Sequence, residues 1–205
     1  MLSAFAVAVV AAAPSVADWK LVADGEVKLY ARKLPGERVA ELRAETLMAA
    51  SAVEVRAVLM DEGYCSKLPH VSEYLTFAHP TPTTSLKYTR LSLPLVSDRD
   101  YYVETTRESD LAPDGTGVLH ISWRPCCVER PEESGAIRLR VNEGYWDIRA
   151  EGDAAHARVT YYLRMDPGGA VPAWIIDIGN RSVMPDVLRS LYDEVKRRRL
   201  VATGR

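Results

Sequence analysis

The sequence has none of the short motifs that mark the common enzyme and nucleotide-binding folds. GxSxG, HExxH, a P-loop and a dinucleotide fingerprint are all missing. Strands do not alternate with helices across Gly-rich turns, which leaves no basis for a doubly wound nucleotide fold. The four histidines, His70, His79, His120 and His156, are scattered, and none is paired at a metal-ligand spacing. We therefore expect no metal and no cofactor.

The chain also lacks an excess of either charge and has few cysteines. Its net charge is −2 with both signs mixed along the chain, which argues against a nucleic-acid partner. Three cysteines do not make a disulfide framework. Cys126 and Cys127 are adjacent and Cys65 is distant, so at most one bridge can form. If the protein is exported, Cys65 is a disulfide candidate with either member of the pair.

No apolar run is long enough to cross a bilayer. Residues 1–13 are almost entirely apolar, but roughly ten such residues are too few to span a membrane. Ser15-Val16-Ala17 resembles a small-x-small cleavage site, although no Lys or Arg stands near Met1. We expect residues 1–17 to be a signal peptide and the protein to be periplasmic or secreted. The alternative is a frayed or mis-started N-terminal helix on a cytoplasmic protein.

The remaining chain reads as one domain, residues 18–200, with a tail at 201–205. Ser51 is a good N-cap for a helix that ends near Gly63, and a short second helix follows over 64–71. Period-two alternation predicts strands on both sides of these helices, and the short polar turns between them predict antiparallel pairing. The strands are expected at 26–33, 39–48, 72–78, 86–93, 100–108, 117–123, 137–142, 144–150 and 157–165. The first two form a hairpin, and a change of apolar parity predicts a turn or bulge at 142–144.

A Pro/Gly turn at 166–169 precedes one long amphipathic helix that extends to Leu200. Its apolar stripe comprises Trp174, Ile178, Met184, Leu188, Leu191 and Val195. Pro185 lies within the stripe and predicts a bend. The cationic run at 196–199 is interpreted as a solvated helix end. This order of elements predicts an α+β fold in which the helix meets a concave apolar face of a long antiparallel sheet.

Four stretches in this order resemble the START (steroidogenic acute regulatory protein-related lipid-transfer) domain family. They are VKLYARK at 27–33, LPLVSDRDY at 93–101, GYW at 144–146 and DPGGAVPAW at 166–174 with Asn180 following. The chain resembles a bacterial single-domain member. The resemblance implies a helix-grip fold, in which a U-shaped antiparallel sheet wraps a long C-terminal helix over an internal tunnel that holds one lipid.

Within such a fold, the inward strand positions and the helix stripe are expected to line the tunnel, although the same aromatic residues could instead fill a solid core. The expected lining residues are Trp123, Leu139, Trp146, Tyr161, Leu163, Trp174, Ile178, Met184 and Leu188. Arg90 is the candidate for a polar head-group contact, with a surface position as its alternative. Gly168 and Gly169 are the candidate hinge of a lid. Arg99 and Asp100 are interpreted as an ion pair or turn hydrogen bonds that fix a loop.

The resulting hypothesis is a monomeric, non-enzymatic protein that binds one sterol, phospholipid or other apolar ligand and transfers it during transient membrane contact. One alternative is an enzyme of the same helix-grip superfamily, related to cyclases or hydrolases, that acts on an apolar substrate. A protein-interaction domain of this fold is a third. The sequence leaves open which lipid is bound, which membranes donate and accept it, and the oligomeric state.

Overall fold

The computed structural model describes residues 19–92, 96–126, 135–152, 154–169, 171 and 173–204, with the side chains of 173–182 outside this description. Ten strands and three helices make up the described part of the chain. Their order is β1 (Lys20–Ala23), β2 (Lys28–Arg32), β3 (Glu41–Met48), α1 (Ala52–Leu59), α2 (Glu62–Cys65), β4 (Val71–Thr81), β5 (Thr84–Leu91), β6 (Asp98–Ser109), β7 (Val118–Pro125), β8 (Ala136–Arg138), β9 (Asn142–Glu151), β10 (His156–Met165) and α3 (Ala173–Ala202).

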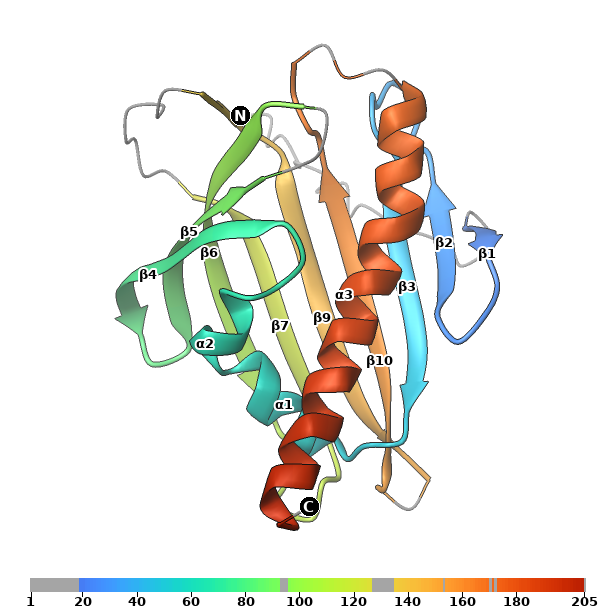
Figure 1. Cartoon of the computed structure of the whole chain (residues 1–205), viewed down its shortest axis with the longest axis vertical. Coiled ribbons are helices and arrows are strands. Elements are labelled where there is room, and N and C mark those ends of the chain that lie inside the picture. The colour runs from blue at the N-terminus through green and yellow to red at the C-terminus, as the bar shows by residue number, and fades with distance from the viewer. Residues whose placement is uncertain are drawn as a thin grey trace, which may run out of the picture.

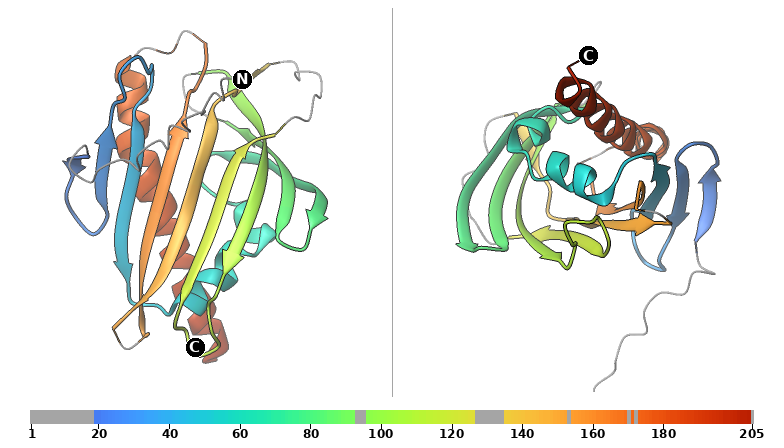
Figure 2. Two further views of the ribbon diagram at one scale, coloured as in Figure 1. Left: turned by 180° about the vertical axis from the view of Figure 1, so that it is seen from behind. Right: turned by 90° about the horizontal axis from the view of Figure 1, so that it is seen from below.

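The strands form one sheet that curls into a U, with α3 lying across its open side (Figures 1 and 2). The spatial order is β1-β2-β3-β10-β9-β7-β6-β5-β4, and neighbours along this path are antiparallel. The short strand β8 pairs with β6 in parallel. Pairing of β10 with β3 joins the N-terminal hairpin to the later strands. The predicted α+β fold with a curved antiparallel sheet and a C-terminal helix is therefore confirmed.

Two sequence-based strand predictions near residue 140 are wrong. The strand predicted over 137–142 is reduced to β8, because the backbone of 139–141 lies outside any strand. The turn or bulge predicted at 142–144 is absent from β9, which pairs with β10 in unbroken register from Asn142 to Glu151; the break between strands lies at 139–141 instead. The inward-facing residues of β9 are Asn142, Gly144, Trp146 and Ile148, which are all buried. Leu139 and Val141 do not share a strand with them, so no bulge is needed.

Helix α1 begins where the sequence predicts. Ser51 is its N-cap and forms a capping box with Glu54: the Glu54 backbone N–H donates to Ser51 Oγ at 3.3 Å, and the Ser51 backbone N–H donates to Glu54 Oε2 at 2.8 Å. Asp61 caps the short helix α2 by accepting a bond from the Gly63 N–H. The apolar face of α1 buries Val55 and Val58 between the sheet and α3.

Helix α3 packs into the main core over the part of its length whose side chains are described. Its later residues Met184, Leu188, Leu191 and Val195 are almost fully buried in the main core, together with α1 and strands β2, β3, β9 and β10. Because these residues repeat at helical spacing, they form one continuous apolar face that packs toward the sheet. The helix continues through Pro185, which is buried.

Candidate functional site

A cavity of about 310 Å³ lies between the concave sheet and the middle of α3. Its wall is built mainly from inward positions of strands β5, β6, β7, β9 and β10, with α1, α2 and the loop after α2 on one side. Val183 and Val187 of α3 close it from above. The strand positions on the wall are Val71, Tyr74, His79, Thr84, Ser85, Lys87, Thr89, Leu91, Tyr101, Val103, Thr105, Arg107, Ile121, Trp123, Asn142, Trp146, Tyr161, Leu163 and Met165.

Stacked aromatic rings form one side of the cavity. Trp146 and Tyr161 face each other across β9 and β10 with ring centroids 4.1 Å apart and an interplanar angle of 11°, and Trp123 follows at 5.9 Å from Tyr161. Gly144 makes this arrangement possible, since a Cβ there would lie 2.4 Å from Trp123 Cζ2. The Trp123 indole N–H donates to Asn142 Oδ1 at 3.2 Å, which fixes the ring.

The opposite side of the cavity is more polar. Lys87 of β5 reaches into it beside Tyr74 and Cys65, and its ammonium lies 5.6 Å from the Tyr74 ring centroid. Burial lowers the pKa of Lys87 and raises the pKa of the Cys65 thiol. Burial also raises the pKa of Tyr101 on β6, and hydrogen bonds to Thr89 and Asn142 oppose part of that rise. This wall can therefore offer hydrogen-bond donors to a bound molecule.

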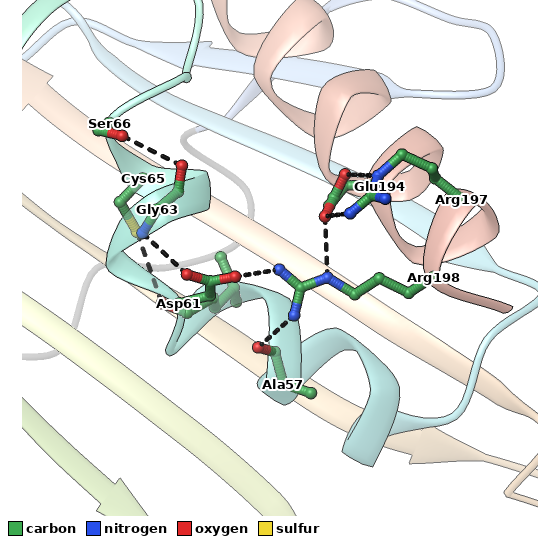
Figure 3. Close-up of polar contacts among 9 residues, drawn as sticks. Ala57, Asp61, Gly63, Cys65, Ser66, Glu194, Arg197 and Arg198 are labelled. Atoms are coloured by element: carbon green, nitrogen blue, oxygen red, sulfur yellow. Dashed lines mark hydrogen bonds and ion pairs between the residues drawn. The ribbon is translucent and has the colours of Figure 1, made fainter. Parts of the chain in front are cut away.

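The C-terminal end of α3 is anchored to α1, contrary to its interpretation as a solvated helix end. Arg198 donates to the Ala57 carbonyl at 3.1 Å and pairs with Asp61 and Glu194 (Figure 3). Arg199 donates to the Ala49 carbonyl at 2.7 Å and to Glu54.

The hydrogen bond from Arg199 lowers the pKa of Glu54 to about 2. The end of α3 is therefore anchored to α1 and to the residues on either side of it. Hydrogen bonds from Arg197 likewise hold the pKa of Glu194 at about 2.

The turn before α3 is fixed from both arms of the sheet. Arg99, buried on β6, donates through Nε to the Pro167 carbonyl at 3.1 Å, and Arg38 donates to the Gly169 carbonyl at 2.8 Å. Gly168 and Gly169 both adopt φ of +62°, and a Cβ on either would lie 3.1 Å from Ile137. This geometry suits the residues predicted as a hinge, whose movement stays a prediction.

Arg99 and Asp100 both hold neighbouring segments in place, as the sequence indicates, but they bind other residues and not each other. Asp100 is 1% exposed and accepts two bonds from Arg138, from Nε at 2.7 Å and from Nη2 at 2.9 Å. The Arg138 guanidinium also lies 4.8 Å from the Tyr102 ring centroid. This bidentate pair holds β8 beside β6.

The predicted lining residues divide into three groups. Trp123, Trp146, Tyr161 and Leu163 lie on the cavity wall. Leu139, Met184 and Leu188 do not: Met184 and Leu188 are buried in the core against α1 and the sheet, and Leu139 is buried beside the end of β8, where its N–H donates to the Asp100 carbonyl. The side chains of Trp174 and Ile178 lie outside the described residues.

The structure places Arg90 away from the cavity. Its Nε donates to Asp98 Oδ2 at 2.9 Å, on the opposite side of β5 from Lys87. The sequence missed Lys87 because its neighbours Leu86 and Tyr88 mark the other side of β5 as apolar. That outer side is covered by an aromatic cluster, in which the rings of Tyr88 and Tyr102 are 4.8 Å apart. The polar residues of β5 therefore face inward, reversing the usual pattern.

The disulfide considered for Cys65 is not formed. Its thiol is free and donates to the Leu59 carbonyl at 3.6 Å, while Cys127 lies outside the described residues. In the described ranges, no three His, Cys, Asp or Glu side chains gather in a way that could hold a metal ion. Among the described helices, none is both long and apolar enough to cross a membrane.

Comparison with known proteins gives a family match over nearly the whole chain. The START domain family model matches residues 2–199. An uncharacterized protein of Pseudomonas aeruginosa is 29% identical over 160 residues, which is 77% of each chain. The phosphatidylcholine transfer protein of Rattus norvegicus is 31% identical over 97 residues, 47% of this chain and 44% of the relative, so the match spans less than half of that protein.

Solved structures give the same match in three dimensions. A STAR-related lipid transfer protein fragment from Xanthomonas axonopodis superposes with a TM-score of 0.73 at 27% identity, covering 87% of this chain and 99% of the fragment. Human StAR-related lipid transfer protein 5 superposes with a TM-score of 0.78 at 18% identity, covering 89% and 88%. At that identity the human protein supports the fold alone.

Proposed function

The chain belongs to the START domain family, and from that premise we propose that it is a non-enzymatic carrier, which holds one hydrophobic ligand in its cavity and transfers it between membranes. The observation that carries this proposal is the cavity of about 310 Å³ between the aromatic wall of the sheet and α3. The lipid-transfer names of the relatives from Xanthomonas axonopodis and Rattus norvegicus also support it.

The energetic cost of an empty cavity favours an occupant. At roughly 24 cal/mol per Å³, a closed and dry void of about 310 Å³ would cost on the order of 7 kcal/mol, which approaches the whole stability of a typical domain. This value is an upper bound, because exposed residues such as Pro82 and Thr83 belong to the lining. Water could fill the side near Lys87, but the aromatic side around Trp146 and Tyr161 offers water few partners. An apolar ligand that packs against this side fills the void and also removes its own apolar surface from water. Each CH₂ group that is buried contributes about 0.8 kcal/mol to binding.

Release of the ligand requires an opening, and the contacts of α3 suggest where it lies. The C-terminal end of α3 is anchored to α1 through Arg198 and Arg199, so movement is more favourable at its N-terminal end. There the chain passes through Gly168 and Gly169, the hinge of the proposed lid. Arg38 and Arg99 hold that turn closed. Arg38 is exposed, so contact with an anionic membrane surface would compete for its guanidinium and favour opening.

Two measurements test the carrier function: which ligand the purified protein holds, and which lipids it transfers between vesicles. Native mass spectrometry of the purified full chain, followed by organic extraction, should find about one apolar molecule per protein. A vesicle assay with fluorescent phospholipid and sterol should then show transfer that depends on the protein. Recovery of a chemically changed ligand would instead support the helix-grip enzyme. An empty protein that moves neither probe would contradict the carrier.

We also propose that the protein acts as a monomer outside the cytoplasm, with residues 1–17 as a cleaved signal peptide. The small-x-small pattern Ser15-Val16-Ala17 supports cleavage before Asp18. The intact mass of the protein isolated from its native host tests this directly. A mass that includes residues 1–17 would contradict export by this route, and sedimentation analysis would test the monomer.

A further inference from the structure

The two sides of the cavity differ in chemistry, and this difference indicates the kind of ligand. Strands β7, β9 and β10 with α3 supply mostly apolar and aromatic side chains, including Ile121, Trp146 and Val183. Strands β5 and β6 with the α2 region supply amino, guanidinium, hydroxyl and thiol groups. These polar wall residues include Ser85, Lys87, Thr89, Thr105, Arg107 and Cys65. A molecule that fills the cavity therefore meets an apolar environment at one end and a polar one at the other.

Lys87 is the most consequential of the polar groups. Its side chain lines the cavity and is largely buried, and within the described part of the chain no carboxylate lies within ion-pair distance of its ammonium. Its close contact is the ring of Tyr74 at 5.6 Å. Burial of the ammonium is costly and lowers the pKa of Lys87, and the electrostatic influence of Glu62 offsets only part of this effect. An anion in the cavity would remove that cost.

The charges around Lys87 leave this side of the cavity positive. Arg107 contributes a second cation to the same wall, although its guanidinium already donates to the Pro82 carbonyl at 3.0 Å and to Met60 Sδ. The only carboxylate among the described lining residues is Glu62, which is exposed at the start of α2. Lys87 therefore has free donor capacity that faces the cavity, and Arg107 adds to the field that attracts an anion.

We propose that the ligand is an acidic lipid, an apolar chain or ring system that ends in one anionic group, and that Lys87 binds this group at the β5 side of the cavity. This assignment rests on the carrier function and adds the ligand class to it. The volume of about 310 Å³ lies at the lower end of ligand pockets, which favours a single-chain acid over a lipid with two acyl chains.

The test compares two probes that differ only at the polar end. Dodecanoic acid and dodecan-1-ol are titrated against the full chain loaded with the fluorescent apolar dye N-phenyl-1-naphthylamine, at neutral pH and constant ionic strength. The wild-type protein should bind the acid about 10- to 100-fold more tightly than the alcohol, the range expected for one buried charge-assisted bond. Lys87→Met should remove this preference by weakening acid binding, with little change for the alcohol. Lys87→Arg should keep most of it.

Lys67→Met is the matched control, because Lys67 is exposed and lies outside the cavity wall. It should leave both affinities unchanged. Thermal unfolding monitors folding of each variant, and the acid-to-alcohol ratio of the wild-type protein tests the proposal even if Lys87→Met does not fold. Inorganic phosphate up to millimolar concentration should displace no dye. Displacement by phosphate alone that depends on Lys87 would show a site for free anions and overturn the lipid assignment.

Failure of this inference is distinguishable from failure of the carrier. Equal affinity for acid and alcohol in the wild-type protein, with no selective effect of Lys87→Met, would overturn the acidic ligand while the carrier function stands. If the dye itself does not bind and neither probe changes the thermal stability of the protein, the cavity does not bind ligands, and both proposals fail.

Discussion

Val183 of α3 offers a direct test of whether the helix covers a hollow or a filled core. Its side chain is partly buried and lies on the cavity wall. Replacing it with Phe projects a larger side chain from the helix into the space above the sheet. If that space is open, the ring fills part of it, buries apolar surface and stabilises the protein. If the space is already filled, the same ring must displace its neighbours.

The two cases predict changes of opposite sign in the free energy of unfolding. Val183→Phe adds four carbon atoms, and at about 0.8 kcal/mol per buried CH₂ the largest possible gain is roughly 3 kcal/mol in the free energy of unfolding. Incomplete burial reduces this, so we expect a gain of about 1 to 2 kcal/mol for the ligand-free protein. Overpacking of a filled core costs about 1 to 3 kcal/mol instead. The new ring also takes the place of ligand carbons, so apolar probes should bind about 10- to 100-fold more weakly.

Val195→Phe is the matched control on the same helix. Val195 is 1% exposed in the core and lies away from the cavity. The control should destabilise the protein while leaving the affinity of the folded fraction unchanged. Urea denaturation of delipidated protein measures stability, and dye displacement measures binding. A destabilised Val183→Phe variant that still binds apolar probes normally would refute the cavity as the binding site.

Three further predictions concern Glu54, the buried pair of Asp100 with Arg138, and the glycine turn before α3. The depressed pKa of Glu54, about 2, gives stability that is present above its ordinary value of 4.5 and is lost as pH falls toward 2. After allowance for solvent screening this amounts to about 1 kcal/mol, so Glu54→Gln should flatten the stability curve over that window in acid titrations. Asp100→Asn breaks the buried pair with Arg138 and should cost about 3 kcal/mol in urea denaturation; a loss below 1 kcal/mol would contradict this. Gly169→Ala should slow vesicle transfer and cost about 1 to 2 kcal/mol, whereas Gly152→Ala, with φ of +60° and open space around it, should cost similarly without slowing transfer.

Local signals account for the parts of the fold that the sequence predicts well. Alternation places β2, β3 and β10, and the Ser51 cap places the start of α1, because each signal lies within a few residues of the element it defines. The Pro/Gly turn likewise precedes α3. Strand β1 was missed because four residues are too few to show a period of two.

The interior of the cavity was predicted less well, because alternation identifies two faces of a strand without saying which faces inward. On β9 and β10 the inner face is apolar, and Trp146 and Tyr161, both predicted to face inward, lie on the cavity wall. On β5 both faces carry large side chains. The outer face is buried by contacts with Tyr102 that no spacing within β5 reveals, so Lys87 was overlooked and Arg90 was favoured.

The anchoring of α3 was missed for a related reason. Arg198 and Arg199 bind Asp61 and Glu54, which are 137 and 145 residues away in sequence. A run of cations at a helix end has a sufficient local explanation in the helix dipole, so nothing in the sequence points to a distant partner. Contacts of this range depend on the final path of the chain.

In the proposed carrier, α3 contributes both to stability and to ligand exchange. Its second half is packed and anchored: Leu191 and Val195 are almost fully buried, and the arginines that follow bind the turns around α1. Closer to the N-terminus of α3, Val183 lies on the cavity wall, and two glycines in a left-handed conformation precede the helix. Because the cavity residues Val183 and Val187 alternate with the core residues Met184 and Leu188, the same stretch of α3 both covers the cavity and packs in the core. In the proposed carrier, opening without loss of the core is confined to the part of α3 that precedes these residues. Loosening the C-terminal anchor should therefore reduce stability more than it changes the rate of exchange, whereas changes at the glycine turn should do the reverse.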